Sequence, residues 1–191
     1  MSRPEPAERL VYASVVEGLL RHGLHGRLTP HLKERLRQIG VDVDRPLLPA
    51  YPVPLWFYCL RAIIEELYPG RDAEAAFRDL GARMTAGYGR TLVGRALYML
   101  ARLQGPRRMV LRLPHMLGSG DNYTRAEVVE RGPCHFEMRM NSALEAPGYA
   151  EGIIEALLQL AGAQAPQVRV VEKGGGSTRY DIRWGEAVTS A

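Results

Sequence analysis

In the first two-thirds of the chain, apolar residues recur three or four positions apart, which is the pattern of helices with one buried face. This spacing predicts helices over residues 5–24, 30–39, 55–67, 72–86 and 91–103. The pair Thr29–Pro30 is typical of a helix start. The proline-rich segment 41–54 predicts a loop, and Pro114 leaves residues 109–117 open between a helix and an extended segment.

Beyond Gly120 the pattern changes to an alternation of apolar and polar residues, which is typical of strands with one buried face. It predicts strands over 123–131, 134–141, 168–173 and 178–184, with a helix over 149–160 between the second and the third. Short glycine-containing segments join the strands in pairs, which predicts two hairpins. The fold class we expect is α+β, with a four-stranded antiparallel sheet of β-β-α-β-β order in the C-terminal third.

The two patterns together predict one domain over residues 1–191. An amphipathic helix or a one-sided sheet has to bury its apolar face against another element. We therefore expect a helical part of about five helices, residues 1–118, to pack on a sheet part, residues 119–186.

The composition is that of an ordinary globular protein, with 46% hydrophobic and 24% charged residues. No apolar run reaches the ~20 residues that a membrane-spanning helix needs. Residues 1–6 carry an acidic residue and two prolines where a secretion signal has a basic and then an apolar segment. Cys59 and Cys134 lie far apart in apolar settings, as expected of free buried thiols. The sequence thus predicts a cytoplasmic protein without a membrane span.

The net charge of +4 raises the question of a nucleic-acid partner. A surface that follows phosphates gathers its basic residues on one face. Here acidic residues are interspersed with the basic ones, and the longest purely basic run is Arg107–Arg108. The charge pattern therefore argues against nucleic-acid binding.

The sequence shows no recognisable catalytic arrangement. Its serines lack the G-x-S-x-G elbow of a nucleophile, and the carboxyls of Glu65 and Glu66 point in different directions on one helix. The glycine-rich segments 87–89 and 174–177 lack the strand–loop–helix setting of a phosphate-binding loop. The histidines and cysteines lack the spacing of a closed zinc site. We therefore expect neither an enzyme nor a metal site.

One histidine lies in an apolar segment at the join between the helices and the sheet. His115 is interpreted first as a buried neutral histidine that is satisfied by a backbone carbonyl. The alternatives are a haem iron ligand or a hydrogen-bond partner of a ligand. A small apolar ligand held between the helices and the inner face of the sheet would contact residues of both. The candidate lining residues are Trp56, Tyr88, His115, Phe136, Met138 and Tyr180.

The outer face of the predicted sheet carries charges of both signs. These residues are Arg125, Glu127, His135, Glu137, Arg139, Arg169, Arg179, Asp181 and Arg183. Mixed signs on one face are typical of a solvated surface. The alternative is a polar docking face for a protein partner or for self-association with a second subunit.

Short motifs along nearly the whole chain occur in an order that is shared with a known family. They are Tyr51–Pro52, Trp56, Leu67–Tyr68–Pro69, Leu80–Gly81–Ala82–Arg83, Gly87–Tyr88, Gly105–Pro106, Asp121–Asn122–Tyr123 and Tyr180–Asp181–Ile182–Arg183–Trp184. Together they resemble the myxobacterial paralogous family, an uncharacterised family of roughly 200-residue proteins.

The segment from Phe136 through residues 148–154 to Tyr180 is more distantly similar to two ligand-sensing domains. These are the four-vinyl-reductase domain and the haem-nitric-oxide/oxygen-binding domain, in which helices precede a hairpin, a helix and a second hairpin. The resemblance implies a small molecule bound between the helices and the sheet. The haem-binding pattern includes a Tyr-x-Ser-x-Arg motif that holds the haem propionates, and this sequence has no such motif.

The leading hypothesis is a non-enzymatic, small-molecule-binding sensory or regulatory module that has no haem or other resident cofactor. Its ligand would alter how the helices and the sheet pack, and so change the affinity for a partner. One alternative is a protein–protein interaction adaptor with a filled interior. A second alternative is a haem-based gas sensor that uses His115.

Overall fold

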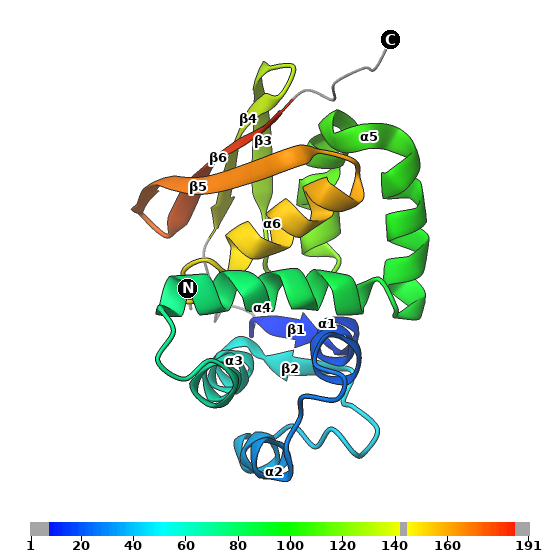
Figure 1. The fold of residues 1–191 in the computed structure, drawn as a ribbon, viewed down its shortest axis with the longest axis vertical. Helices are drawn as coiled ribbons and strands as arrows, with labels where there is room; N and C mark the ends of the chain where they lie inside the picture. Colours follow the sequence, from blue (N-terminus) through cyan, green and yellow to red (C-terminus); the bar gives the residue numbers. More distant parts are fainter. Residues whose placement is uncertain (1–7, 142–144, 186–191) are drawn as a thin grey trace, which may run out of the picture.

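The structure is a computed structural model that describes residues 8–141 and 145–185. Figure 1 shows a group of N-terminal helices beneath a sheet, with α4 between them. The elements in chain order are β1 (Leu10–Tyr12), α1 (Ala13–Glu17), the π-helix η1 (Gly18–Gly23), α2 (Pro30–Ile39), β2 (Ala50–Pro52), α3 (Val53–Leu67), α4 (Ala73–Tyr88), α5 (Leu92–Gly118), β3 (Ala126–Gly132), β4 (His135–Asn141), α6 (Tyr149–Leu160), β5 (Gln164–Gly174) and β6 (Ser177–Gly185). The predicted α+β class is confirmed.

Side-chain caps mark the starts of two helices in the N-terminal part, α2 and α4. The Thr29 hydroxyl oxygen accepts a hydrogen bond from the Leu32 backbone N–H at 3.0 Å and caps α2. The Asp72 carboxylate accepts one from the Ala75 N–H at 2.9 Å and caps α4. Helix α3 carries the buried Trp56 into the core between these helices. Capping therefore sets the helix starts, and burial of one face holds the helices together.

The predicted helix over residues 5–24 is wrong at its N-terminal end. Its first residues, 5–7, lie outside the described residues, and the next ones lead into strand β1. β1 pairs antiparallel with β2, inside the segment that the prolines predicted to be a loop. A hydrogen bond of 2.9 Å from the Val53 N–H to the Arg9 carbonyl extends this pairing. Backbone pairing with a distant segment thus overrides the helical spacing of the side chains.

Helix α5 is interrupted at Gly105 and then continues through residues 109–117. The sequence pattern did not decide between a helix and an extended segment for these residues. Gly105 has non-helical angles, φ 77° and ψ 169°, so the chain turns there as the Gly105–Pro106 pair predicts. Residues 109–117 form the second helical segment, in spite of Pro114. Met109 and Leu113 are fully buried on its inner side. Their burial stabilises a helix that a proline alone would weaken.

Helices α4 and α6 cross at very short range because glycines face each other at the crossing. A Cβ atom at Gly81 would lie 2.2 Å from the Tyr149 carbonyl oxygen. A Cβ atom at Gly152 would lie 1.9 Å from the Arg78 carbonyl oxygen. Side chains at either position would push the helices apart, so the two glycines set how close α6 lies to α4.

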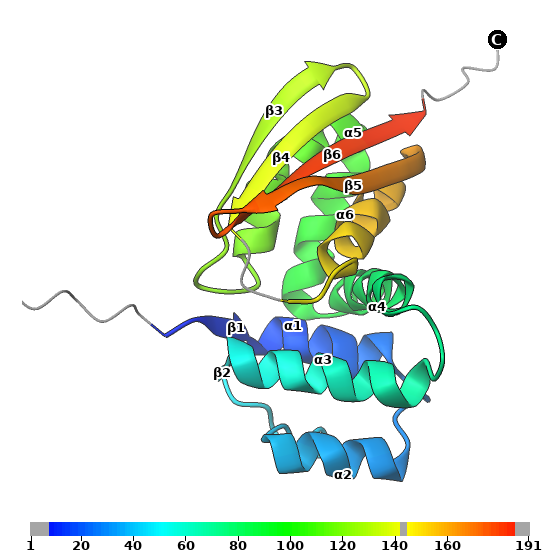
Figure 2. The ribbon, with the colours of Figure 1, turned by 90° about the vertical axis from the view of Figure 1, so that its left-hand side faces the viewer.

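The sheet has the order β3-β4-β6-β5, with antiparallel neighbours throughout. Figure 2 shows α5 and α6 against one face of this sheet, with the other face open. Phe136 and Met138 of β4 are fully buried on the covered face, as the alternation predicts. The four predicted strands and the helix between the hairpins are present, with bounds that differ by a few residues at most.

None of the helices in the described ranges is long and apolar enough to cross a membrane. Both cysteines are free. Cys59 is buried as expected, and burial raises the pKa of its thiol to about 12. Cys134 is only half-buried, which corrects the expectation of two buried thiols.

Candidate functional site

A pocket of about 150 Å³ lies where the N-terminal helices, α5, α6 and the inner face of the sheet meet. Its lining residues are Val11, Val15, Trp56, Met84, Tyr88, Leu97, Tyr98, Met116, Leu117, Gly120, Asp121, Tyr123, Thr124, Met140, Asn141, Ala146, Tyr149, Ala150, Ile153, Leu157 and Tyr180. Most of these side chains are apolar or aromatic. A concave, mainly apolar site with a few polar groups is the usual form of a small-molecule site.

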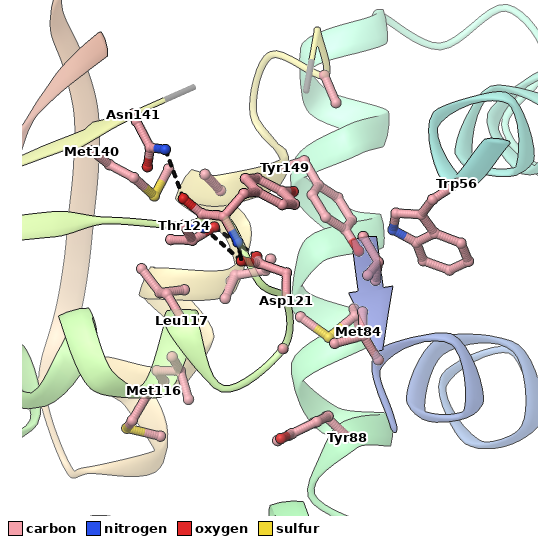
Figure 3. Close-up of a pocket in the computed structure, with 18 of the residues that line it drawn as sticks. Trp56, Met84, Tyr88, Met116, Leu117, Asp121, Thr124, Met140, Asn141 and Tyr149 are labelled. Carbon is pink, nitrogen blue, oxygen red and sulfur yellow. Dashed lines mark hydrogen bonds between the residues drawn. The ribbon is translucent and has the colours of Figure 1, made fainter. Parts of the chain in front are cut away.

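Three methionines from three different elements form part of the wall. Met84 comes from α4, Met116 from α5 and Met140 from β4, and Figure 3 shows them around the same space. An unbranched thioether side chain adapts its shape to its neighbours more readily than a branched one. This wall can therefore adjust to ligands of somewhat different shape.

One edge of the pocket is polar, and its groups bond to each other. The Asp121 carboxylate accepts hydrogen bonds from the Tyr123 N–H at 3.0 Å, the Thr124 N–H at 2.6 Å and the Thr124 hydroxyl at 2.6 Å. The Asn141 amide donates to the Tyr123 carbonyl at 2.8 Å and accepts from the Arg125 N–H at 2.6 Å. These bonds hold the segment between α5 and β3 in place at the pocket edge.

Two tyrosine hydroxyls at the pocket are buried without a hydrogen-bond partner among the described residues. They belong to Tyr88 of α4 and Tyr149 of α6, whose residues are only 6% and 5% exposed. Burial raises the pKa of Tyr149, Tyr123 adds to the rise, and the nearby Trp56 indole opposes it. In Figure 3 Tyr149 points toward Trp56, whereas Tyr88 points toward Met116. A buried polar group without a partner is costly and calls for an explanation.

The backbone around Tyr88 is held by close packing. A Cβ atom at Gly18 of η1 would lie 2.8 Å from the Tyr88 Cα atom. The Tyr88 ring packs on that of Tyr98, with centroids 5.9 Å apart. Burial raises the pKa of Tyr98, and Tyr88 beside it adds to the rise. The position of the Tyr88 hydroxyl is thus set by η1 and α5 on either side.

Three of the six candidate lining residues, Trp56, Tyr88 and Tyr180, lie in the pocket wall. Phe136 and Met138 are buried on the inner face of the sheet but do not line the pocket. The Phe136 ring stacks on Trp184 at 5.6 Å between centroids and fills that part of the core. Strand alternation identifies the inner face, but it does not show which positions face a hollow.

His115 lies outside this pocket. The structure corrects the interpretation of a buried histidine, because His115 is exposed. It lines a separate surface groove together with Arg125, Glu127 and Arg139. In this arrangement His115 does not reach a ligand held in the pocket.

The sequence-based candidates do not include the polar edge or Tyr149. The Asp121–Asn122 pair after a glycine is typical of a turn in which the carboxylate accepts backbone hydrogen bonds, so this signal was available. Tyr149 follows a glycine at the start of a clearly predicted helix. No local pattern indicates that its hydroxyl lacks a partner.

Ion pairs join many of the charged side chains on the outer face of the sheet. Glu137 pairs with Arg131 at 2.9 Å and with Arg179 at 3.7 Å. Asp181 pairs with His135 at 2.6 Å and with Arg183 at 2.8 Å. Charges that neutralise each other on an exposed face are typical of a solvated surface.

The described residues contain no group of three or more histidine, cysteine or acidic side chains placed to hold a metal ion. The pocket wall offers hydrogen-bonding groups and thioethers. Its one pair of a hydroxyl and a carboxylate among the described lining residues, Thr124 and Asp121, is part of the hydrogen bonds that hold the segment at the pocket edge. The arrangement is therefore suited to binding.

The fold is similar to that of H-NOX domains, the haem-nitric-oxide/oxygen-binding domains. The chain superposes on an oxygen-binding H-NOX domain related to soluble guanylate cyclases, in its oxygen complex, with a TM-score of 0.67 and 16% identity over 93% of this chain and 95% of that one. It superposes on an H-NOX protein from S. oneidensis in the Fe(II)NO state with a TM-score of 0.70 and 11% identity over 91% and 99%. At these identities the likeness shows the fold.

The family model described as "Protein of unknown function (DUF2378)" matches residues 9–185, so the chain belongs to this family. None of the curated proteins matches the sequence. The resemblance to an uncharacterised family and to haem-nitric-oxide/oxygen-binding domains is thereby confirmed. The myxobacterial origin remains a prediction.

The described lining residues do not fit a haem. They include no histidine or cysteine, and no lysine or arginine that could hold propionates. The three methionines do not replace these ligands, because methionine ligates haem iron together with a histidine. Tyrosine can ligate haem iron as a phenolate, but burial raises the pKa of Tyr98 and Tyr149 and so opposes that form. The volume of about 150 Å³ is also below the ~300–1,000 Å³ of usual ligand and cofactor sites.

Proposed function

We propose that this chain is a non-enzymatic, small-molecule-binding sensory or regulatory module of the cytoplasm. Its ligand occupies the pocket between the N-terminal helices and the inner face of the sheet. Trp56, Tyr88 and Tyr180 are the sequence-based candidates that contact the ligand, and Tyr149 and the methionine wall join them.

The observation that carries this proposal is a mainly apolar pocket into which two buried hydroxyls without partners are built, at Tyr88 and Tyr149. A core residue that served packing alone would be better as phenylalanine, because a buried hydroxyl without a partner lowers stability. Both residues line the described pocket, where a small molecule can supply the hydrogen bond that the Tyr88 hydroxyl lacks. The fold supports the same function, since the similar structures include proteins with oxygen or NO bound.

The position of the pocket suggests how ligand binding could be passed on to a partner. Its wall takes side chains from β1, α1, α3 and α4 on one side and from β4 and β6 on the other. A ligand that contacts both sides favours one relative packing of the two, and it can shift an equilibrium only by its difference in affinity for the two packings. The outer sheet face or another exposed surface then presents the change to a partner.

A haem-based gas sensor is the second candidate, and the fold likeness to H-NOX structures favours it. The described lining residues oppose it, because they include no histidine and no cationic side chain. The adaptor hypothesis is the third candidate, and the paired charges of the outer sheet face give it no specific support.

Native mass spectrometry, an absorbance scan and xenon binding followed by NMR test the proposal on the purified full chain. We expect a bound small molecule or bound xenon, no Soret band in the protein as purified, and no shift of the free-hemin band when hemin is added. A Soret band would overturn the proposal in favour of haem sensing, and its loss in His115→Ala would then identify the iron ligand. If the pocket takes up neither a small molecule nor xenon, the proposal fails and the hypothesis of a protein–protein interaction adaptor remains.

A matched pair of variants shows whether binding occurs in this pocket. Ala150 of α6 lines the pocket, and Ala150→Leu should fill it and abolish binding. Ala156 of the same helix lines a shallow surface groove instead, so Ala156→Leu should bind as the wild type does. Equal binding by both variants would contradict the assignment of the site.

A further inference from the structure

We infer that the pocket selects an uncharged molecule about the size of one six-membered ring, with a hydrogen-bond acceptor that bonds to the Tyr88 hydroxyl. This inference deepens the proposed function and rests on it. Three independent features of the described pocket carry it: its volume, the charge state of its wall and the position of the unpartnered hydroxyl.

The volume limits the size of the ligand. An engineered protein cavity of about 150 Å³ takes up benzene. The present pocket has about the same volume, which corresponds to a single ring with one or two further atoms. A larger ligand would extend beyond this volume toward the open side of the pocket.

The wall selects against charge. The described lining residues include no lysine, arginine or histidine to pair with an anion. Their one carboxylate, Asp121, already accepts three hydrogen bonds from Tyr123 and Thr124. A cation would have to compete with these bonds, and an ion of either sign would lose its hydration without a new counter-charge. The site therefore favours a neutral molecule.

The Tyr88 hydroxyl supplies the directional contact. Its residue is 6% exposed, and the oxygen has no partner among the described residues. It points toward Met116 across the pocket (Figure 3), and thioether sulfur is a weak acceptor. Tyr149 differs, because its hydroxyl lies on the side of the Trp56 indole. A carbonyl or ether oxygen on the ligand would complete the bonding of Tyr88.

Three small molecules of similar size separate the requirements: cyclohexanone, methylcyclohexane and the cyclohexylammonium ion. Each is titrated into the full chain that carries ¹³C-labelled methionine methyl groups. Met84, Met116 and Met140 line the pocket and report binding, and Met99 is 65% exposed outside it and serves as an internal control.

We expect the two neutral molecules to shift the three pocket resonances and leave that of Met99 unchanged, with no effect from cyclohexylammonium. Tyr88→Phe should weaken cyclohexanone binding about 2- to 10-fold, the effect of one hydrogen bond, and leave methylcyclohexane binding unchanged. Tyr58→Phe is the control, because the Tyr58 side chain is exposed and outside the pocket.

The outcomes also separate this inference from the proposed function. Unchanged cyclohexanone affinity in Tyr88→Phe, or cyclohexylammonium binding as tight as that of cyclohexanone, would overturn the inference while the pocket remains a binding site. If no probe shifts the pocket methionines and xenon does not bind either, the proposed function fails as well.

Discussion

Two buried tyrosines of similar exposure differ in the bonding of their hydroxyls. Tyr68 is 7% exposed, donates its hydroxyl proton to the Asp79 carboxylate, and accepts a hydrogen bond from the Arg83 guanidinium at 3.0 Å. Tyr88 is 6% exposed, and its hydroxyl has no such partner among the described residues. The first hydroxyl is expected to contribute to stability, whereas the second is expected to lower it in the ligand-free protein.

Replacement of each tyrosine by phenylalanine should therefore have opposite effects in the ligand-free protein. Tyr88→Phe should raise the free energy of unfolding by about 1 kcal/mol, because it removes a buried hydroxyl without a partner. Tyr68→Phe should lower it by about 1–3 kcal/mol, because Asp79 and Arg83 lose a bonding partner. Urea denaturation measures both. A Tyr88→Phe variant as destabilised as Tyr68→Phe would show that the Tyr88 hydroxyl has a partner after all.

The same cluster predicts a pH dependence. Burial opposes ionisation of Asp79, but the hydrogen bonds from Tyr68 and Arg83 outweigh it and lower the pKa of the Asp79 carboxyl below its usual value. A lowered pKa gives stability that is present above the unfolded-state value and lost as the pH falls through the folded-state value. Asp79→Asn should thus cost about 1 kcal/mol at pH 7, with allowance for solvent, and nothing below the lowered pKa.

Urea denaturation at pH 7 and at intervals down to pH 2 measures this dependence. Asp44→Asn is the control, because Asp44 pairs with Lys33 on the surface and such pairs contribute little. A difference between Asp79→Asn and the wild type that stays constant down to pH 2 would contradict the assigned role of the Asp79 charge.

At the scale of elements, the predictable parts were those whose signal is local. The helix over 149–160 was predicted with its observed bounds, since its apolar residues recur at helical spacing and glycines at positions 148 and 162 flank it. Strands β1 and β2 were missed, because each has three residues and exists only through pairing with the other. Trp56, Tyr88 and Tyr180 were predicted as lining residues and do line the pocket. The pocket forms only where elements distant in the sequence meet, so no local sequence pattern indicates its presence or its shape.

The crossing of α4 and α6 gives a prediction at this scale. Gly152→Ala would place a Cβ atom 1.9 Å from the Arg78 carbonyl oxygen, so the helices must separate. We expect a loss of about 2–3 kcal/mol in the free energy of unfolding and weaker ligand binding, because Tyr149 and Ile153 move with α6. The measurements are thermal denaturation and titration with cyclohexanone.

Gly118 provides the matched control for this substitution. It also lies in a helix, but the nearest atom to its added Cβ, the Thr124 carbonyl oxygen, is 3.6 Å away. Gly118→Ala should therefore be neutral or slightly stabilising, by up to about 0.5 kcal/mol. A Gly152→Ala variant as stable as Gly118→Ala would mean that the two helices do not cross at such short range in solution.

For the whole molecule, the pocket lies where two groups of elements meet. Val15 of α1 and Met84 of α4 contribute from one group, and Met140 of β4 and Tyr180 of β6 contribute from the other. A ligand bound to this wall contacts both groups at once. Binding energy therefore opposes any opening that separates the N-terminal helices from the sheet.

Hydrogen exchange tests this coupling. With cyclohexanone at about 100 times its dissociation constant, openings that break the pocket should cost about 2.7 kcal/mol more, so protection should rise in both α4 and β4. Local opening of α2 should not change, because none of its residues lines the pocket. Tyr88→Phe, which we expect to bind cyclohexanone more weakly, should show a smaller rise at the same concentration. Protection gained in only one of the two elements would mean that the ligand does not join the two groups, and a sensor based on their relative packing would then be excluded.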